Sequence, residues 1–92
     1  MAIQSAIELE AVLTRVVIKI DKQIQERGQA PALEEARRQL EQVQKVTRQS
    51  AKLKAMRETL RKASETIVSE VANDSPLHDD CWDMEDFVDY RA

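Results

Sequence analysis

The chain is 92 residues long, with 34% charged residues, a net charge of −3, one Gly and two Pro. This length allows one small domain with a modest core, and an aromatic content of 3% makes that core mainly aliphatic. The scarcity of turn-forming residues argues against a β-sandwich or a βαβ enzyme and favours an all-α protein. Cys81 is the one cysteine, so an internal disulfide is excluded. With no apolar run near the ~20 residues of a membrane span and no signal-peptide pattern, we expect a cytoplasmic protein.

Residues 5–27 are predicted to form the first helix. Ser5 followed by Glu8 is a capping-box pattern, which satisfies free N–H groups at a helix start. At 100° per residue the apolar side chains fall on two sides of this helix, and a helix that is apolar on two sides usually packs against two neighbours. The broad face holds Leu9, Val12, Leu13, Val16, Val17, Ile20 and Ile24, and the opposite face holds Ile3, Ile7, Ala11 and Ile18.

Residues 28–31 are predicted to form a turn and residues 32–73 a long second helix. Gly28 suits the position after a helix end, and Pro31 suits the first position of the next helix. No Gly or Pro interrupts the following stretch, whose apolar residues recur three or four apart. The short turn predicts an antiparallel αα-hairpin with a coiled-coil-like second helix. Unbroken, that helix would run ~64 Å, longer than a domain of this size is wide.

The second helix therefore overhangs the first, and its apolar stripe needs a cover. The clearest heptad spacing lies in this overhang, at Leu53, Met56, Leu60, Ala63 and Ile67. Either a second subunit covers it in a homodimeric bundle, or the helix breaks near 47–50, with Ser50 as a cap, into a three-helix bundle. We favour the unbroken helix because Gly or Pro usually marks a break. The predicted dimer interface consists of Ile7, Ile18, Leu53, Met56, Leu60 and Ile67, with Ala11 beside them.

Residues 74–92 differ from the rest of the chain and are predicted to form an acidic aromatic tail after Asn73. The tail carries seven acidic residues against one basic residue, a net charge of −6, and it holds every aromatic residue. As a helix, it would place Cys81, Met84 and Val88 along one side, which suits docking into a groove. Aromatic side chains commonly anchor binding sites, and acids steer them to basic surfaces. The predicted partner-binding residues are Trp82, Met84, Phe87, Val88 and Tyr90.

Two other interpretations of the tail stay open. The tail can cover a basic belt on its own chain or on a second subunit, because residues 45–62 carry seven basic residues against one acidic residue, a net charge of +6. Alternatively, Trp82 and Phe87 simply cap the exposed end of the bundle.

The basic belt suggests a second class of function, a nucleic-acid-associated regulator with the tail as an internal phosphate mimic. Its phosphate contacts would come from Lys45, Arg48, Lys52, Arg57 and Arg61. No aromatic residue interleaves them for base stacking, and the pI near 5.2 opposes binding to an anion. A solvated helix surface is therefore the favoured interpretation of the belt.

Catalytic chemistry is hard to assemble from this sequence. His78 and Cys81 lie three residues apart among carboxylates, but a structural zinc site needs a second Cys/His pair. Acidic neighbours raise a thiol's pKa, which disfavours Cys81 as a nucleophile. We expect no catalytic residues, metal or cofactor.

The favoured function is a non-enzymatic helical protein–protein interaction module, such as an adaptor, a small chaperone or an inhibitor. It would act by occlusion or bridging. On this hypothesis, deletion of residues 77–92 abolishes partner binding but leaves the helix content and the oligomeric state nearly intact.

Overall fold

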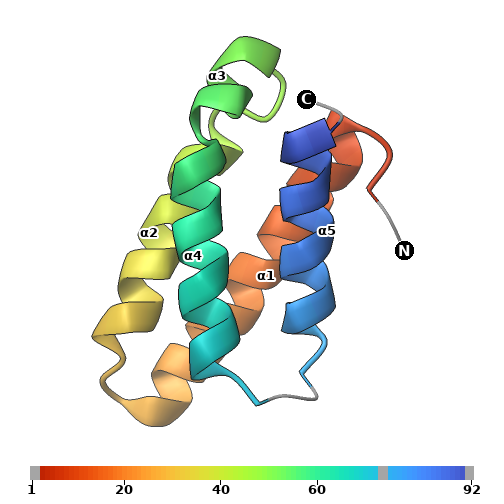
Figure 1. Ribbon diagram of the computed structural model, residues 1–92. Coiled ribbons are helices and arrows are strands. Elements are labelled where there is room, and N and C mark those ends of the chain that lie inside the picture. Colours follow the sequence, from red (N-terminus) through yellow and green to blue (C-terminus); the bar gives the residue numbers. More distant parts are fainter. Residues whose placement is uncertain (1–2, 73–74, 91–92) are drawn as a thin grey trace.

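A computed structural model describes residues 3–72 and 75–90 of the chain. These residues contain helices and turns but no strand, which confirms the all-α prediction (Figure 1). The predicted helix end at Asn73 and the predicted tail boundaries at Asp74 and Ala92 lie outside the described residues. The helices are α1 (Ala6–Arg27), α2 (Pro31–Gln44), α3 (Ser50–Ala55), α4 (Arg57–Glu70) and α5 (Leu77–Tyr90).

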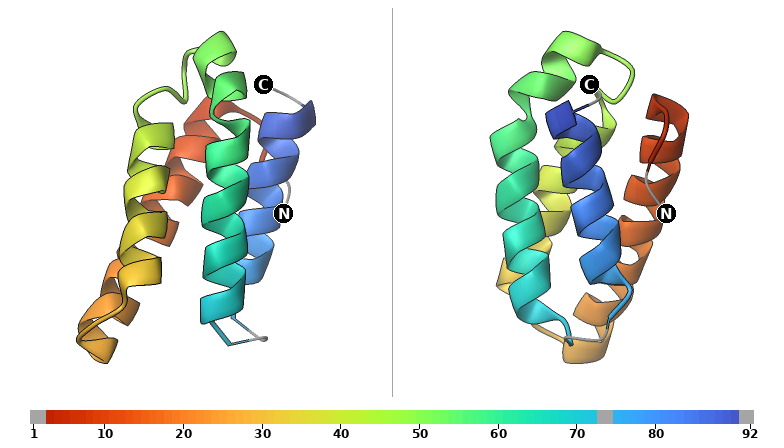
Figure 2. Two further views of the ribbon diagram at one scale, coloured as in Figure 1. Left: turned by 60° about the vertical axis from the view of Figure 1, so that its left-hand side comes forward. Right: turned by 45° about the vertical axis from the view of Figure 1, so that its right-hand side comes forward.

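The four longer helices form an antiparallel bundle, in which successive long helices run in opposite directions (Figure 1). Around the bundle the order is α1, α2, α4, α5, so α5 returns to pack beside α1. The α2–α4 pair packs most extensively, and the α1–α5 pair is the least closely packed of the four neighbouring pairs. The short α3 lies at one end of the bundle, within the connection from α2 to α4 (Figure 2).

The first helix and its turn follow the local sequence signals. The Ser5 hydroxyl accepts a hydrogen bond from the Glu8 amide at 3.2 Å, so Ser5 is the N-cap of α1. At the other end, the Gly28 amide donates to the Ile24 carbonyl, and its φ of 78° is one that only glycine adopts readily. Pro31 then occupies the first position of α2. Helix α1 therefore begins at Ala6, one residue after the predicted start, and the connection to α2 ends at Ala30, because Pro31 is already helical.

The predicted unbroken helix over 32–73 is wrong. Helix α2 ends at Gln44, residues 45–48 form turns, and α4 runs back along α2. The molecule is consequently only 36 Å long, against the ~64 Å of a continuous helix. The break falls close to the predicted alternative at 47–50. However, the N-cap residue of the new helix is Gln49 and not the predicted Ser50, which is already helical. The described bundle also has four long helices, where the alternative predicted three.

Tertiary contacts hold this break in place without Gly or Pro. The Thr47 hydroxyl donates to Glu10 Oε1 on α1 at 2.6 Å, and Arg48 forms two hydrogen bonds with the same carboxylate. These contacts fix the turn against α1. By folding back, the chain also removes the apolar stripe of α4 from water. Burial of this stripe contributes more to the free energy of folding than the propensity of residues 45–49 to continue the helix.

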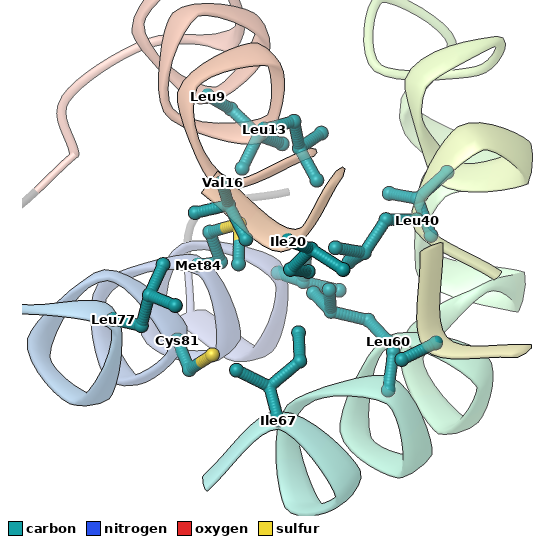
Figure 3. Packing of buried hydrophobic residues seen from close by; sticks show 14 of the residues in the cluster. Leu9, Leu13, Val16, Ile20, Leu40, Leu60, Ile67, Leu77, Cys81 and Met84 are labelled. Carbon is teal, nitrogen blue, oxygen red and sulfur yellow. The ribbon is translucent and has the colours of Figure 1, made fainter. Parts of the chain in front are cut away.

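All four long helices contribute to one aliphatic core (Figure 3). Leu13 and Ile20 of α1, Leu40 of α2 and Ile67 of α4 are fully buried there. Residues predicted to form a separate tail belong to the same core. They are Leu77, Cys81, Met84, Phe87 and Val88, on the inner side of α5. From Leu77 to Tyr90, the acidic C-terminal segment is therefore α5, the fourth long helix of the bundle.

Candidate functional site

The outward side of α5 carries the exposed part of the predicted binding segment. Trp82 is 68% exposed and Tyr90 is 84% exposed, although large aromatic side chains are usually buried. Acidic side chains lie on the same side because the spacing of three or four residues repeats a helical turn. We call this surface the outer face of α5; it consists of Asp79, Trp82, Asp83, Asp86 and Tyr90.

The other three predicted anchors require a correction. Met84, Phe87 and Val88 are buried against the rest of the bundle, where they cannot reach a partner without unfolding of α5. The stripe that they form with Cys81 was expected to dock into a partner's groove. The chain's own α1 and α4 provide that groove instead.

The six residues of the predicted dimer interface likewise include both buried and exposed side chains. Leu53, Leu60 and Ile67 are buried within the single chain, and Met56 packs against the core, so the expected overhang does not exist. Ile7 and Ile18 are 67% and 62% exposed, on the outward side of α1. Of the six residues, only these two present a largely exposed side chain to a second molecule.

A groove runs between α1 and α5, where the bundle is least closely packed. Its volume is about 470 Å³. Ile3, Ala11, Val12 and Pro76 give it apolar walls. The charged lining residues are four carboxylates and a single guanidinium, from Glu8, Asp79, Asp80, Asp83 and Arg15. The groove therefore combines apolar surface with an excess of negative charge.

Asp80 is the deepest of these carboxylates, at 8% exposure. Its Oδ1 accepts a hydrogen bond from Arg15 Nη2 at 2.8 Å. Its Oδ2 is buried and accepts no hydrogen bond, and Lys19 Nζ lies 3.8 Å away, beyond hydrogen-bonding distance. Arg15 and Lys19 of α1 thus both form ion pairs with this carboxylate.

Arg15 and Asp80 were not among the site residues predicted from the sequence. A signal was present, because Asp80 falls on the same side of a helix as Met84 and Phe87, and an acid on an apolar side is rarely buried without a partner. Identifying Arg15 as that partner requires the packing of α5 on α1.

The basic belt is partly neutralised by the chain's own carboxylates. Arg48 pairs with Glu10 at 2.9 Å, which lowers the pKa of the Glu10 carboxyl through the hydrogen bond between them. Arg57 pairs with Asp89, and Arg61 pairs with Glu58 of its own helix. Of the five predicted phosphate-binding residues, Lys45 and Lys52 are exposed and make no ion pair with another described residue.

Cys81 lies in the core, where burial raises the pKa of its thiol to about 12, with the carboxylates of Glu85 and Asp80 adding to the effect. Such a thiol is a poor nucleophile at neutral pH. Within residues 3–72 and 75–90, no three His, Cys, Asp or Glu side chains are grouped so that they could hold a metal ion. No described helix is both long enough and apolar enough to cross a membrane.

Comparisons of the chain with protein-family models, with curated proteins and with solved structures find no match. The class of protein is therefore defined by the architecture alone, an all-helical bundle with an acidic groove and an exposed aromatic face.

Proposed function

We propose that this protein is a non-enzymatic helical interaction module that binds a basic amphipathic segment of a partner protein against α1 and α5. The observation that carries the proposal is the outer face of α5, where Trp82 and Tyr90 are largely exposed among carboxylates. An adaptor, a small chaperone or an inhibitor would use such a face to bridge or to cover its partner.

Trp82 and Tyr90 expose large aromatic side chains to water in the free protein. Burial of an exposed tryptophan or tyrosine in an interface removes much apolar surface from water, and these residue types dominate binding hot spots. The neighbouring carboxylates keep the surface soluble in the free protein and favour partners of opposite charge.

The α1–α5 groove extends this surface from the outer face of α5 toward α1. Its apolar walls suit the leucine-like side of an amphipathic helix, and its carboxylates suit the basic residues that flank such a side. Ile7 and Ile18 on α1 supply further exposed apolar area. A partner segment that lies across the two helices would thus contact apolar groups in its centre and acids at its margins.

The proposal is tested with synthetic amphipathic peptides about four helical turns long, one with lysines and one with glutamates on the polar side. Trp82 is the single tryptophan, so its emission reports on burial of the outer face. The lysine peptide is expected to bind with a blue shift of this emission, and the glutamate peptide is expected not to bind.

Calorimetry with variants then locates the binding site. Trp82→Ala, and the combined Asp79→Asn and Asp86→Asn variant, should each weaken binding at least about tenfold, the equivalent of 1.4 kcal/mol. Glu35→Gln removes a charge from α2, the helix diagonal to α5, and should change nothing. Equal binding of the two peptides, or equal losses in all variants, would contradict the proposal.

A nucleic-acid-associated regulator is the second candidate, favoured by the ion pair between Arg57 of the belt and Asp89 of the acidic helix. On this hypothesis Asp89 occupies the place of a phosphate. Asp89→Asn should then increase the binding of duplex DNA or RNA in a gel shift, with a steep dependence on salt. The absence of a shift at low salt in both proteins would eliminate this candidate.

A further inference from the structure

Some carboxylates of α5 face a neighbouring helix and others face outward, and the two kinds differ in their partners. Asp80 pairs with two cations of α1, and Asp89 pairs with an arginine of α4. Asp79 and Asp86 are exposed on the outer face of α5, and neither forms an ion pair with another described residue. The chain thus supplies cations to these inward carboxylates and none of its described cations to these outward ones.

Trp82 lies between these two outward carboxylates along the helix. Asp79 precedes it by three residues and Asp86 follows it by four, and side chains at these spacings are neighbours about 5–6 Å apart on a helix surface. The Trp82 side chain is 68% exposed, so its ring is open to a ligand. Solubility explains the carboxylates but not the tryptophan, whose large apolar ring is usually buried. An aromatic ring with a negative charge one turn away on either side suits a planar cation.

The choice between the two common cations of a protein partner follows from their shape and hydration. A guanidinium is planar and weakly hydrated, so it can stack on an indole ring while its N–H groups donate to a carboxylate at the ring's edge. An ammonium is compact and strongly hydrated, so it loses more of its hydration on contact with an aromatic ring. Cation–π contacts in proteins accordingly involve arginine more often than lysine, and tryptophan is the best aromatic partner.

We infer that Trp82 stacks on an arginine side chain of the partner segment, whose guanidinium donates hydrogen bonds to Asp79 or Asp86. This inference rests on the proposed function and adds the residue type that the outer face of α5 selects, arginine in preference to lysine. Tyr90 also exposes an aromatic ring, but among the described residues a carboxylate lies one turn away from it on one side only, at Asp86. The preference for arginine is therefore assigned to Trp82.

The test uses one amphipathic peptide sequence in two forms, with lysine at every basic position or with arginine at every basic position. Calorimetry measures the affinity of both forms for the wild-type protein, which should bind the arginine form about fivefold more tightly. Trp82→Leu keeps an apolar side chain and all the carboxylates but removes the aromatic ring, so it should bind both forms equally. Tyr90→Leu is the matched control on the same helix and should retain the fivefold preference.

Two further measurements locate the contact. The ring current of an indole moves the NMR signals of a stacked arginine side chain upfield, so this shift should appear with the wild-type protein and with Tyr90→Leu but not with Trp82→Leu. The combined Asp79→Asn and Asp86→Asn variant should show a smaller preference for the arginine form, because its acceptors have lost their charge.

The outcomes separate this inference from the proposed function. Equal affinity of the two forms for the wild-type protein, or a preference that Trp82→Leu or the combined Asn variant leaves unchanged, would overturn the inference alone, since binding of the lysine form would still support the proposed function. Failure of both forms to bind the wild-type protein would overturn the proposed function and this inference with it.

Discussion

Arg57 Nε on α4 lies 2.6 Å from Asp89 Oδ1 on α5, so the acidic last helix forms an ion pair with the basic segment of its own chain. Covering of the belt by the acidic segment was one of the interpretations left open by the sequence. The Arg57 side chain is 53% exposed and the Asp89 side chain 23% exposed. Water and salt therefore screen the pair, and exposed pairs of this kind contribute little to stability.

We predict that Asp89→Asn lowers the free energy of unfolding by less than about 1 kcal/mol and that the difference shrinks at high salt. Urea unfolding at low and high ionic strength measures it. Asp86→Asn is the matched control because it removes the same charge from an exposed position on the same helix. A loss that is several times larger, or one that salt leaves unchanged, would show that the ion pair has a structural role that its exposure does not explain.

The second prediction separates the inner side of α5 from its outer face. Met84 is fully buried, so Met84→Ala should lower the free energy of unfolding by about 2–5 kcal/mol through lost burial and a residual cavity. Trp82→Ala changes an exposed position and should cost about 0.5 kcal/mol or less. Urea unfolding, monitored by circular dichroism, compares the two variants. Equal losses in the free energy of unfolding would contradict the burial of Met84 and the exposure of Trp82.

Burial of the inner side of α5 contradicts the expectation that deletion of residues 77–92 leaves the helix content nearly intact. Deletion of residues 77–92 removes a core helix and exposes the apolar sides of α1 and α4, so we now expect this variant to unfold. Point variants such as Trp82→Ala are consequently the appropriate test of partner binding.

The elements that could be predicted from the sequence are those with local signals. Ser5, Gly28 and Pro31 each determine backbone geometry through their own chemistry, so α1 and the first turn follow from them. The break after Gln44 has no such signal. Contacts of Thr47 and Arg48 with Glu10, 37 and 38 residues away, hold it in place, and residues so distant in sequence give no local pattern.

The candidate site was predictable only in part, for a related reason. The apolar stripe of residues 81–88 was visible in the sequence, but periodicity does not say whether a partner or the chain itself covers a stripe. Here the chain covers it, which buries Met84 and leaves Trp82 exposed on the opposite side. The groove lies between α1 and α5, which are neighbours because of the order of the helices around the bundle. The periodicity of a single helix does not predict that order.

The third prediction concerns the number of subunits. A dimer was expected because the stripe at Leu53, Leu60 and Ile67 was predicted to be uncovered, and the single chain covers it. We therefore expect light scattering coupled to size exclusion to give a mass near 10.5 kDa. A mass of twice this value that returns to 10.5 kDa in the double variant Ile7→Lys and Ile18→Lys would instead assign the exposed side of α1 to a dimer interface.

The last prediction follows from the Cys81 thiol, whose pKa burial raises to about 12 in the folded protein. In the unfolded chain a thiol loses its proton near pH 8.5. Between these two values the unfolded state binds fewer protons than the folded state, so rising pH favours unfolding. The contribution of Cys81 is a fall in the free energy of unfolding of about 1.4 kcal/mol per pH unit.

Cys81→Ala removes this contribution but keeps the other titrating groups. In urea unfolding across pH 8 to 11, the free energy of unfolding should therefore fall more steeply with pH for the wild type than for Cys81→Ala. This difference in slope does not depend on how much stability the variant loses at pH 7 through poorer packing. A thiol reagent such as dithiobis-nitrobenzoate should react slowly with native protein and rapidly in urea, because the thiol is buried. Parallel pH profiles, or rapid labelling of the native protein, would place Cys81 in contact with water and contradict its position in the core.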